Sequence, residues 1–176
     1  MPVLNLNFKF FKKGVRASAL ASLLFISNSA FASPTKLKLP DLRSNGKQHI
    51  AQKNQASVVL AIQPDCPWCT KQGKDLKLLK DRCGDQLNLV ILGARGSKKE
   101  LKQELQHFSP ELRALLSNSK LNKQVRGIKG TPSLLFFTAD GTLVSKRRGY
   151  LKTDILMQAG SMLIEEQGGE AKACEV

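Results

Sequence analysis

The fold is decided by residues 57–69, which read Ser-Val-Val-Leu-Ala-Ile-Gln-Pro-Asp-Cys-Pro-Trp-Cys. The first six form a short apolar, β-branched run, which predicts a buried strand over Ser57–Ile62. After Cys66, apolar residues recur at the three- and four-residue spacing of a helix, as in Leu76, Leu79 and Cys83. Pro67 suits the first turn of that helix and Gly84 suits its end. The sequence therefore predicts a Cys-x-x-Cys pair at a strand–helix junction.

Further elements follow toward the C-terminus. Leu87–Leu92 predicts a second buried strand. Ser97 and Glu100 form a capping-box pattern, which predicts a helix whose apolar side holds Leu101, Leu105 and Phe108. Ser109-Pro110-Glu111 predicts a second helix start, with an apolar side made of Leu112, Leu115 and Leu116. This stretch would form a helical insertion.

The last part of the chain predicts a hairpin and a final helix. Ser133–Thr138 is the expected strand, Asp140-Gly141 the turn and Thr142–Ser145 the start of the returning strand. Thr153 or Asp154 would cap the helix, and Gly168-Gly169 would end it. Its expected inward residues are Ile155, Ala159, Met162 and Leu163. The element order predicts an α/β fold with a central mixed sheet, parallel at first and antiparallel at the hairpin.

The cysteine pair fits thiol–disulfide exchange. That chemistry needs an exposed thiolate that attacks and a second thiol that releases the mixed disulfide. Cys66 would be the outer, attacking residue because a helix N-terminus stabilises its thiolate. Cys69, one turn further in, would resolve the intermediate. Zinc sites share this spacing, but no second close pair of ligands follows, so we predict no metal site and no cofactor.

These motifs together resemble the thioredoxin superfamily, nearest to its exported bacterial thiol–disulfide oxidoreductases of the TlpA-like and DsbC-like kinds. Three pieces match in order: Val58-Val59-Leu60 leading to the cysteines, Gly127 to Pro132 with the strand after it, and Asp140-Gly141-Thr142 to Gly149-Tyr150-Leu151. The resemblance covers roughly residues 40–165. It implies a thioredoxin fold, with the insertion placed before the strand that follows a cis-proline.

The resemblance also implies site residues. A cis Thr131–Pro132 bond would lie beside the redox pair, and Thr131, Pro132 and Trp68 would contact the substrate. Thioredoxins bury an aspartate six residues before the first cysteine, where this chain has Leu60. The direction of the reaction (oxidase, reductase or isomerase) is not set by these residues.

The N-terminus predicts export. Four cations, Lys9, Lys12, Lys13 and Arg16, precede an apolar stretch and then Ala30-Phe31-Ala32, the pattern of a cleaved secretory signal. The expected divisions are a signal peptide over 1–32, cleaved after Ala32, an N-terminal extension over 33–55, a thioredoxin-like domain over 56–168 and a C-terminal tail over 169–176. We expect a periplasmic protein with no stable membrane insertion after cleavage.

The expected partners are substrate proteins with thiols or disulfides and a redox partner protein. The formal net charge of +14 favours acidic partners, but one Trp and one Tyr offer no stacking platform, so we predict no nucleic-acid binding. Cys83 and Cys174 would either stay free or form a structural disulfide. Two alternative functions remain: an exported copper or zinc chaperone of the same fold, and a non-catalytic binding module.

Overall fold

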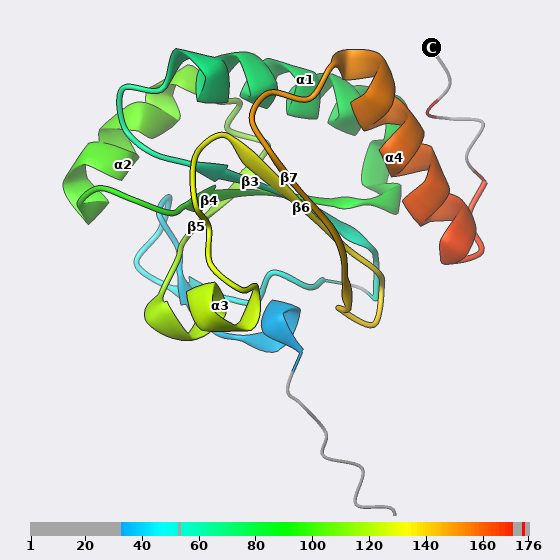
Figure 1. Cartoon of the computed structure of the whole chain (residues 1–176), viewed down its shortest axis with the longest axis horizontal. Coiled ribbons are helices and arrows are strands. Elements are labelled where there is room, and N and C mark those ends of the chain that lie inside the picture. The colour runs from blue at the N-terminus through cyan, green and yellow to red at the C-terminus, as the bar shows by residue number, and fades with distance from the viewer. Residues whose placement is uncertain (1–32, 53, 171–173, 175–176) are drawn as a thin grey trace, which may run out of the picture. The chain divides into compact units, whose positions relative to one another are not determined.

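The computed structural model describes residues 33–52, 54–170 and 174, so the predicted signal peptide lies outside the described residues. A mixed five-stranded sheet has the order β5-β4-β3-β6-β7 (Figure 1). The central strand β3 runs parallel to β4, and β4 runs parallel to β5, whereas β6 and β7 add antiparallel pairings. The predicted α/β thioredoxin fold with a mixed sheet is confirmed.

The element bounds are as follows. The strands are β1 (Leu39–Pro40), β2 (Lys47–Gln48), β3 (Ser57–Ile62), β4 (Asn88–Gly93), β5 (Arg113–Leu116), β6 (Ser133–Phe137) and β7 (Leu143–Arg148). The α-helices are α1 (Pro67–Cys83), α2 (Lys98–Glu104), α3 (Ser119–Gln124) and α4 (Thr153–Glu166). Short 3₁₀ turns cover Pro34–Lys36, Gly84–Gln86 and Leu105–His107.

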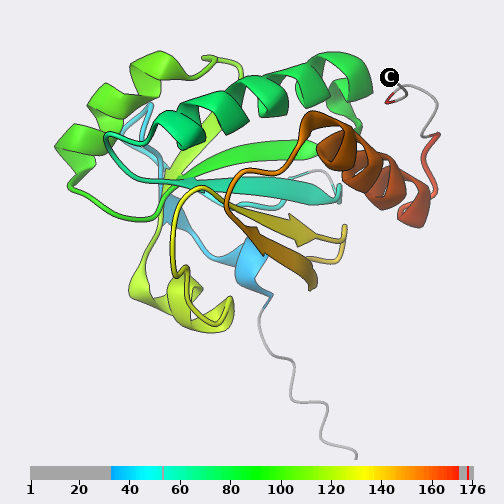
Figure 2. The same ribbon diagram turned by 45° about the horizontal axis from the view of Figure 1, so that its top comes forward.

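Helices cover both faces of the sheet. α1, α2 and α4 lie over one face, while α3 and the N-terminal segment lie against the other, as both views show (Figures 1 and 2). Side chains of β3 alternate between the two layers, since Val58 and Leu60 face the α1 side and Val59 and Ala61 face the α3 side. Every residue of β3 is buried, as expected for a central strand covered on both faces.

The predicted helix start at Ser109 is wrong, because this segment forms a turn and then the edge strand β5. Its leucines fit both periods. Leu112 and Leu115 are helically spaced, but Leu112, just before the strand, and Leu115, within it, pack on opposite faces of the sheet, and both are fully buried. The strand is favoured because it pairs with the open edge of β4. The insertion is therefore α-helical only in α2 and α3, with a 3₁₀ turn at Leu105–His107, and α3 was not predicted.

The predicted inward face of α4 is also wrong in part. Ile155 and Met162 are 45% and 63% exposed, whereas Leu156, Met157 and Ile164 are buried. Gly160 explains the rotation, because a Cβ there would lie 2.7 Å from Leu79 Cδ1 of α1. The glycine brings α4 close to α1 and turns its neighbouring face inward.

The structure confirms the predicted cap of α2 and the predicted end of α4 but not the predicted N-cap of α4. Ser97 and Glu100 form the expected capping box of α2. Gly168, in a left-handed conformation, follows α4 as predicted. The N-cap of α4 is Lys152, not Thr153 or Asp154, because the Thr153 hydroxyl instead donates to Asp75 on α1.

No helix within residues 33–170 (residue 53 excepted) is long and apolar enough to cross a membrane.

Candidate active site

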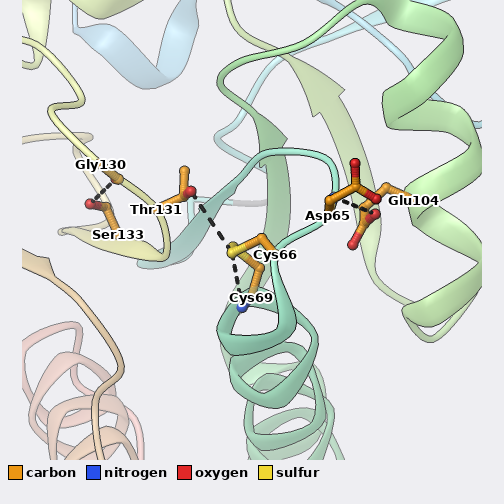
Figure 3. The surroundings of a disulfide bond; sticks show 7 residues. All are labelled: Asp65, Cys66, Cys69, Glu104, Gly130, Thr131 and Ser133. Atoms are coloured by element: carbon orange, nitrogen blue, oxygen red, sulfur yellow. Dashed lines mark hydrogen bonds between the residues drawn. A yellow bond between two sulfur atoms is a disulfide. The ribbon is translucent and has the colours of Figure 1, made fainter.

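Cys66 and Cys69 lie at the start of α1 and are joined by a disulfide (Figure 3). Cys66 is the N-cap residue and Cys69 lies within the first turn, with 5.2 Å between their Cα atoms. Pro67 occupies the first helical position, where a missing amide hydrogen breaks no helical bond. The buried strand β3 leads directly into this turn, so the sheet fixes where the two sulfurs sit.

The two sulfurs differ in access. Cys66 retains 9% of its surface, whereas Cys69 is fully buried. Of the two residues, only Cys66 therefore has surface open to an incoming sulfur.

The helix start also favours negative charge on Cys66. The Cys69 amide donates a hydrogen bond to Cys66 Sγ over 3.2 Å. α1 has 17 residues, and the unpaired amides at its N-terminus carry a partial positive charge. When the disulfide is reduced, these amides can stabilise a thiolate at Cys66.

The Thr131–Pro132 loop lies against this pair. The Thr131–Pro132 bond is cis, and Thr131 Oγ1 is 3.9 Å from Cys66 Sγ (Figure 3). The Ser133 hydroxyl donates to the Gly130 carbonyl over 2.7 Å, and the Gly149 amide donates to the Pro132 carbonyl over 2.8 Å. The structure thus brings Thr131, which is 65 residues after Cys66 and directly before Pro132, to the redox pair.

Trp68 projects into solvent beside the pair and is 57% exposed. Its ring lies 5.6 Å from that of Tyr150, and Lys71 Nζ is 4.5 Å from the Tyr150 ring centroid. The pKa of Tyr150 is raised: a hydrogen bond with Thr153 lowers it, but partial burial and the nearby carboxylate of Asp75 outweigh that bond. The sequence motif identified Trp68 but not its two partners.

The sequence profile of the thioredoxin-like domain family matches residues 44–161. The chain belongs to this thioredoxin-like family. No curated protein sequence matches the chain significantly.

Solved structures share the thioredoxin-like fold. A secreted Mycobacterium tuberculosis disulfide oxidoreductase aligns with a TM-score of 0.60 at 13% identity, over 73% of this chain and 97% of that one. StoA from Bacillus subtilis aligns with a TM-score of 0.58 at 16% identity, over 70% and 94% of the two chains. A thiol-disulfide isomerase from Corynebacterium glutamicum gives 0.59 at 16% identity, over 73% and 94%. At these identities the likeness concerns the fold.

Two buried polar residues of this thioredoxin-like site escaped the sequence analysis. Gln72, fully buried on α1, accepts a hydrogen bond from the Leu151 amide and donates one to the Leu151 carbonyl. Glu104 lies at the end of α2 and is 9% exposed. Its carboxylate accepts a hydrogen bond of 3.2 Å from the Asp65 amide (Figure 3). Asp65 has a φ of 52°, a left-handed conformation that this hydrogen bond helps to hold. Each contact joins a residue close to the cysteines in sequence, Asp65 or Gln72, to a distant one, Glu104 or Leu151, so no local motif marks it.

Cys83 and Cys174 form a second disulfide, with Cα atoms 4.7 Å apart. Both are buried, with 1% exposure each. Cys83 is the last residue of α1, about 25 Å along the helix from the redox pair at a rise of about 1.5 Å per residue. The structure therefore separates this bond from the candidate active site.

The part of the chain that the structure describes contains no group of three or more His, Cys, Asp or Glu side chains placed to hold a metal ion.

Proposed function

We propose that this thioredoxin-like protein is an exported thiol–disulfide oxidoreductase that exchanges disulfides with substrate proteins through Cys66 and Cys69. The observation that carries the proposal is the asymmetry of the pair at the helix start. Cys66 keeps 9% of its surface exposed and its sulfur accepts a hydrogen bond from a backbone amide, whereas Cys69 is fully buried. A purely structural disulfide has no need of this arrangement.

In the oxidising direction, a substrate thiolate attacks Cys66 Sγ. The Cys66–Cys69 bond breaks, a substrate–Cys66 disulfide forms, and Cys69 leaves as a thiolate that takes a proton from solvent. A second substrate thiolate then attacks the substrate sulfur of this mixed disulfide and releases Cys66. Two electrons pass from the substrate dithiol to the protein. The reducing direction is the reverse, with Cys69 resolving the mixed disulfide, and the relative reduction potentials decide between them.

Thr131, Pro132 and Trp68 would contact the substrate. Among residues 33–52, 54–170 and 174, no backbone hydrogen bond involves the amide or carbonyl of Thr131. These groups can pair with an extended substrate segment as an added strand would. Trp68, exposed in the first turn of α1 between the two cysteines, offers a broad apolar contact.

Export would bring the protein into an oxidising compartment, where protein disulfides persist. The N-terminal pattern supports cleavage after Ala32 and a periplasmic mature chain that begins at Ser33. We divide that chain into an extension over 33–55, the catalytic domain over 56–168 and a tail over 169–176, with Cys83–Cys174 as its structural disulfide.

Two single variants test the function. Cys66→Ser should reduce protein disulfide exchange, measured by insulin reduction and by refolding of scrambled ribonuclease, to the background rate. Cys69→Ser should leave Cys66 able to react but unable to be released, so a mixed disulfide with the substrate should accumulate and be visible by mass spectrometry.

The control is Cys83→Ser/Cys174→Ser, which removes both sulfurs of the second disulfide, away from the site. This double variant should keep its exchange activity at a temperature where it stays folded. Normal exchange by Cys66→Ser would refute the proposed function.

A further inference from the structure

A basic groove lies beside the Thr131–Pro132 loop. Its cavity of about 320 Å³ is lined by Arg126, Gly127, Lys129, Ser133, Lys146 and Arg148. Four of these six residues are cationic and none is acidic. They come from two separate parts of the chain, the segment after α3 and the edge strand β7, which the fold brings together.

The groove is continuous with the candidate active site. Arg148 pairs in register with Ser133, the residue directly after the cis-proline. The Arg148 side chain runs along Gly130, where an added Cβ would lie 3.3 Å from Arg148 Cδ. Thr131, next to Gly130, lies 3.9 Å from Cys66 Sγ. A substrate segment paired with Thr131 would therefore extend directly over this groove.

One cation has a structural role in the protein. Lys146 Nζ donates to the carbonyls of Val125, Arg126 and Gly127 and thereby closes the C-terminal end of α3. This leaves Arg126, Lys129 and Arg148 as the cations that can meet a ligand.

These three side chains are exposed, and no carboxylate of the described residues forms a salt bridge with them. Charged residues on an edge strand can also serve to prevent pairing with other chains. That role covers Arg148 but not Arg126 and Lys129, which lie in a loop outside the sheet. A cluster of like charges without counter-charges favours an anionic partner.

We propose that this groove binds acidic side chains next to the reactive cysteine of a substrate protein, so that the protein exchanges disulfides fastest with acidic segments. The inference rests on the proposed function and names its substrate class. An extended segment paired with Thr131 presents alternate side chains to the same side, which brings acidic residues near Lys129 and Arg148.

The test uses two peptides that each carry one cysteine as a disulfide with a coloured thiol. They are identical except that glutamates flank the cysteine in one and glutamines in the other. Reduced protein is mixed with each peptide, and release of the coloured thiol is followed by stopped flow. We expect the acidic peptide to react about tenfold faster at about 0.01 M salt, and the difference to vanish at about 1 M salt, where screening is strong.

Charge reversal locates the effect. Lys129→Glu/Arg148→Glu should abolish or invert the preference for the acidic peptide. The matched control is Lys36→Glu/Lys38→Glu, which changes the net charge equally on two residues of the N-terminal segment, whose Ser33 donates to Gly141 at the opposite end of the β6–β7 hairpin. This control should keep most of the preference. If the reversed variant does not fold, Lys129→Gln/Arg148→Gln carries the test and should lose the preference.

The outcomes are distinguishable. Reaction with neither peptide would refute the proposed function itself. Equal rates with both peptides, or equal loss of preference in both double variants, would overturn the groove proposal and leave the function standing. A single-stranded DNA that inhibits the reaction more strongly than an acidic peptide without cysteine would also overturn it in favour of a nucleic-acid site.

Discussion

Single buried polar residues hold the surroundings of the redox pair in place. Gln72 lies three residues after Cys69 on the inner face of α1, and its amide group pairs with both backbone groups of Leu151. Leu151 directly follows Tyr150, which packs against Trp68. Gln72 therefore ties the helix that carries the cysteines to the loop that supports the exposed tryptophan.

Replacing Gln72 by Ala should destabilise the protein by about 1–3 kcal/mol, because it leaves the Leu151 amide and carbonyl without partners in a half-buried place. Gln72→Glu should retain part of the stability at neutral pH, since a carboxylate accepts from the amide but cannot donate to the carbonyl. Urea unfolding followed by circular dichroism measures both. Lys74→Ala, an exposed change on the same helix, is the control, and an equal loss there would contradict the assigned role of Gln72.

At the level of elements, the sequence predicted strands better than it predicted helix faces. β3, β6 and the start of α1 were predictable because each is marked by a short sequence pattern that fits only one structure. These patterns are a β-branched segment, an Asp-Gly turn and a proline after the N-cap. β5 could not be assigned because Leu112, Leu115 and Leu116 satisfy both periods, and the open edge of β4 decides between them. In the same way, α4 carries two apolar stripes, and the close approach at Gly160 selects one.

The same limit applies to the site. Cys66, Cys69, Trp68 and the Thr131–Pro132 pair were predictable because local motifs mark them. The Glu104–Asp65 contact spans 39 residues and depends on where α2 ends against the sheet. The sequence analysis also left the pairing of Cys83 with Cys174 open, because the course of the tail decides it.

The Cys83–Cys174 disulfide connects the end of α1 to the tail across 91 residues. Closing a loop of that length restricts the unfolded chain and stabilises the fold by about 4–5 kcal/mol in the chain-entropy model. Cys174→Ser should lose about that amount in urea unfolding under oxidising conditions. Under reducing conditions the variant and the parent protein should unfold at the same urea concentration. A remaining difference under reducing conditions would show that Cys174 acts through packing instead.

For the molecule as a whole, the N-terminal segment is part of the folded unit. Leu39, Leu42 and Ile50 are buried against the sheet. Arg113 of β5 donates to the backbone carbonyls of His49 and Ile50. The backbone of Asp41 forms an isolated antiparallel β-bridge with Leu115 of β5, and this pairing connects the β1–β2 hairpin to the edge of the sheet. The stability of the whole chain should therefore respond to the charge state of this hairpin.

Asp41 makes that response a function of pH. Burial raises its pKa, but hydrogen bonds from the Arg43 and Ser44 amides, the Ser44 hydroxyl and the Gln48 amide group outweigh burial and hold it below 3.8. A carboxyl group whose pKa is lower in the folded state stabilises the fold above its unfolded pKa. That contribution is lost as the pH falls through 3.8 and below the folded pKa.

Asp41→Asn should therefore lower the free energy of unfolding at pH 7. It should also make that free energy fall less steeply as the pH drops through 3.8 and below. Urea unfolding at a series of pH values above and below 3.8 measures the slope. Ser44→Ala removes one of the hydrogen bonds to this carboxylate but keeps its charge, so the folded pKa should rise toward 3.8 and the acid decline should become shallower, though less so than in Asp41→Asn. If Asp41→Asn has the same acid slope as the parent protein, other carboxylates control the acid unfolding, and the hairpin does not couple pH to the fold.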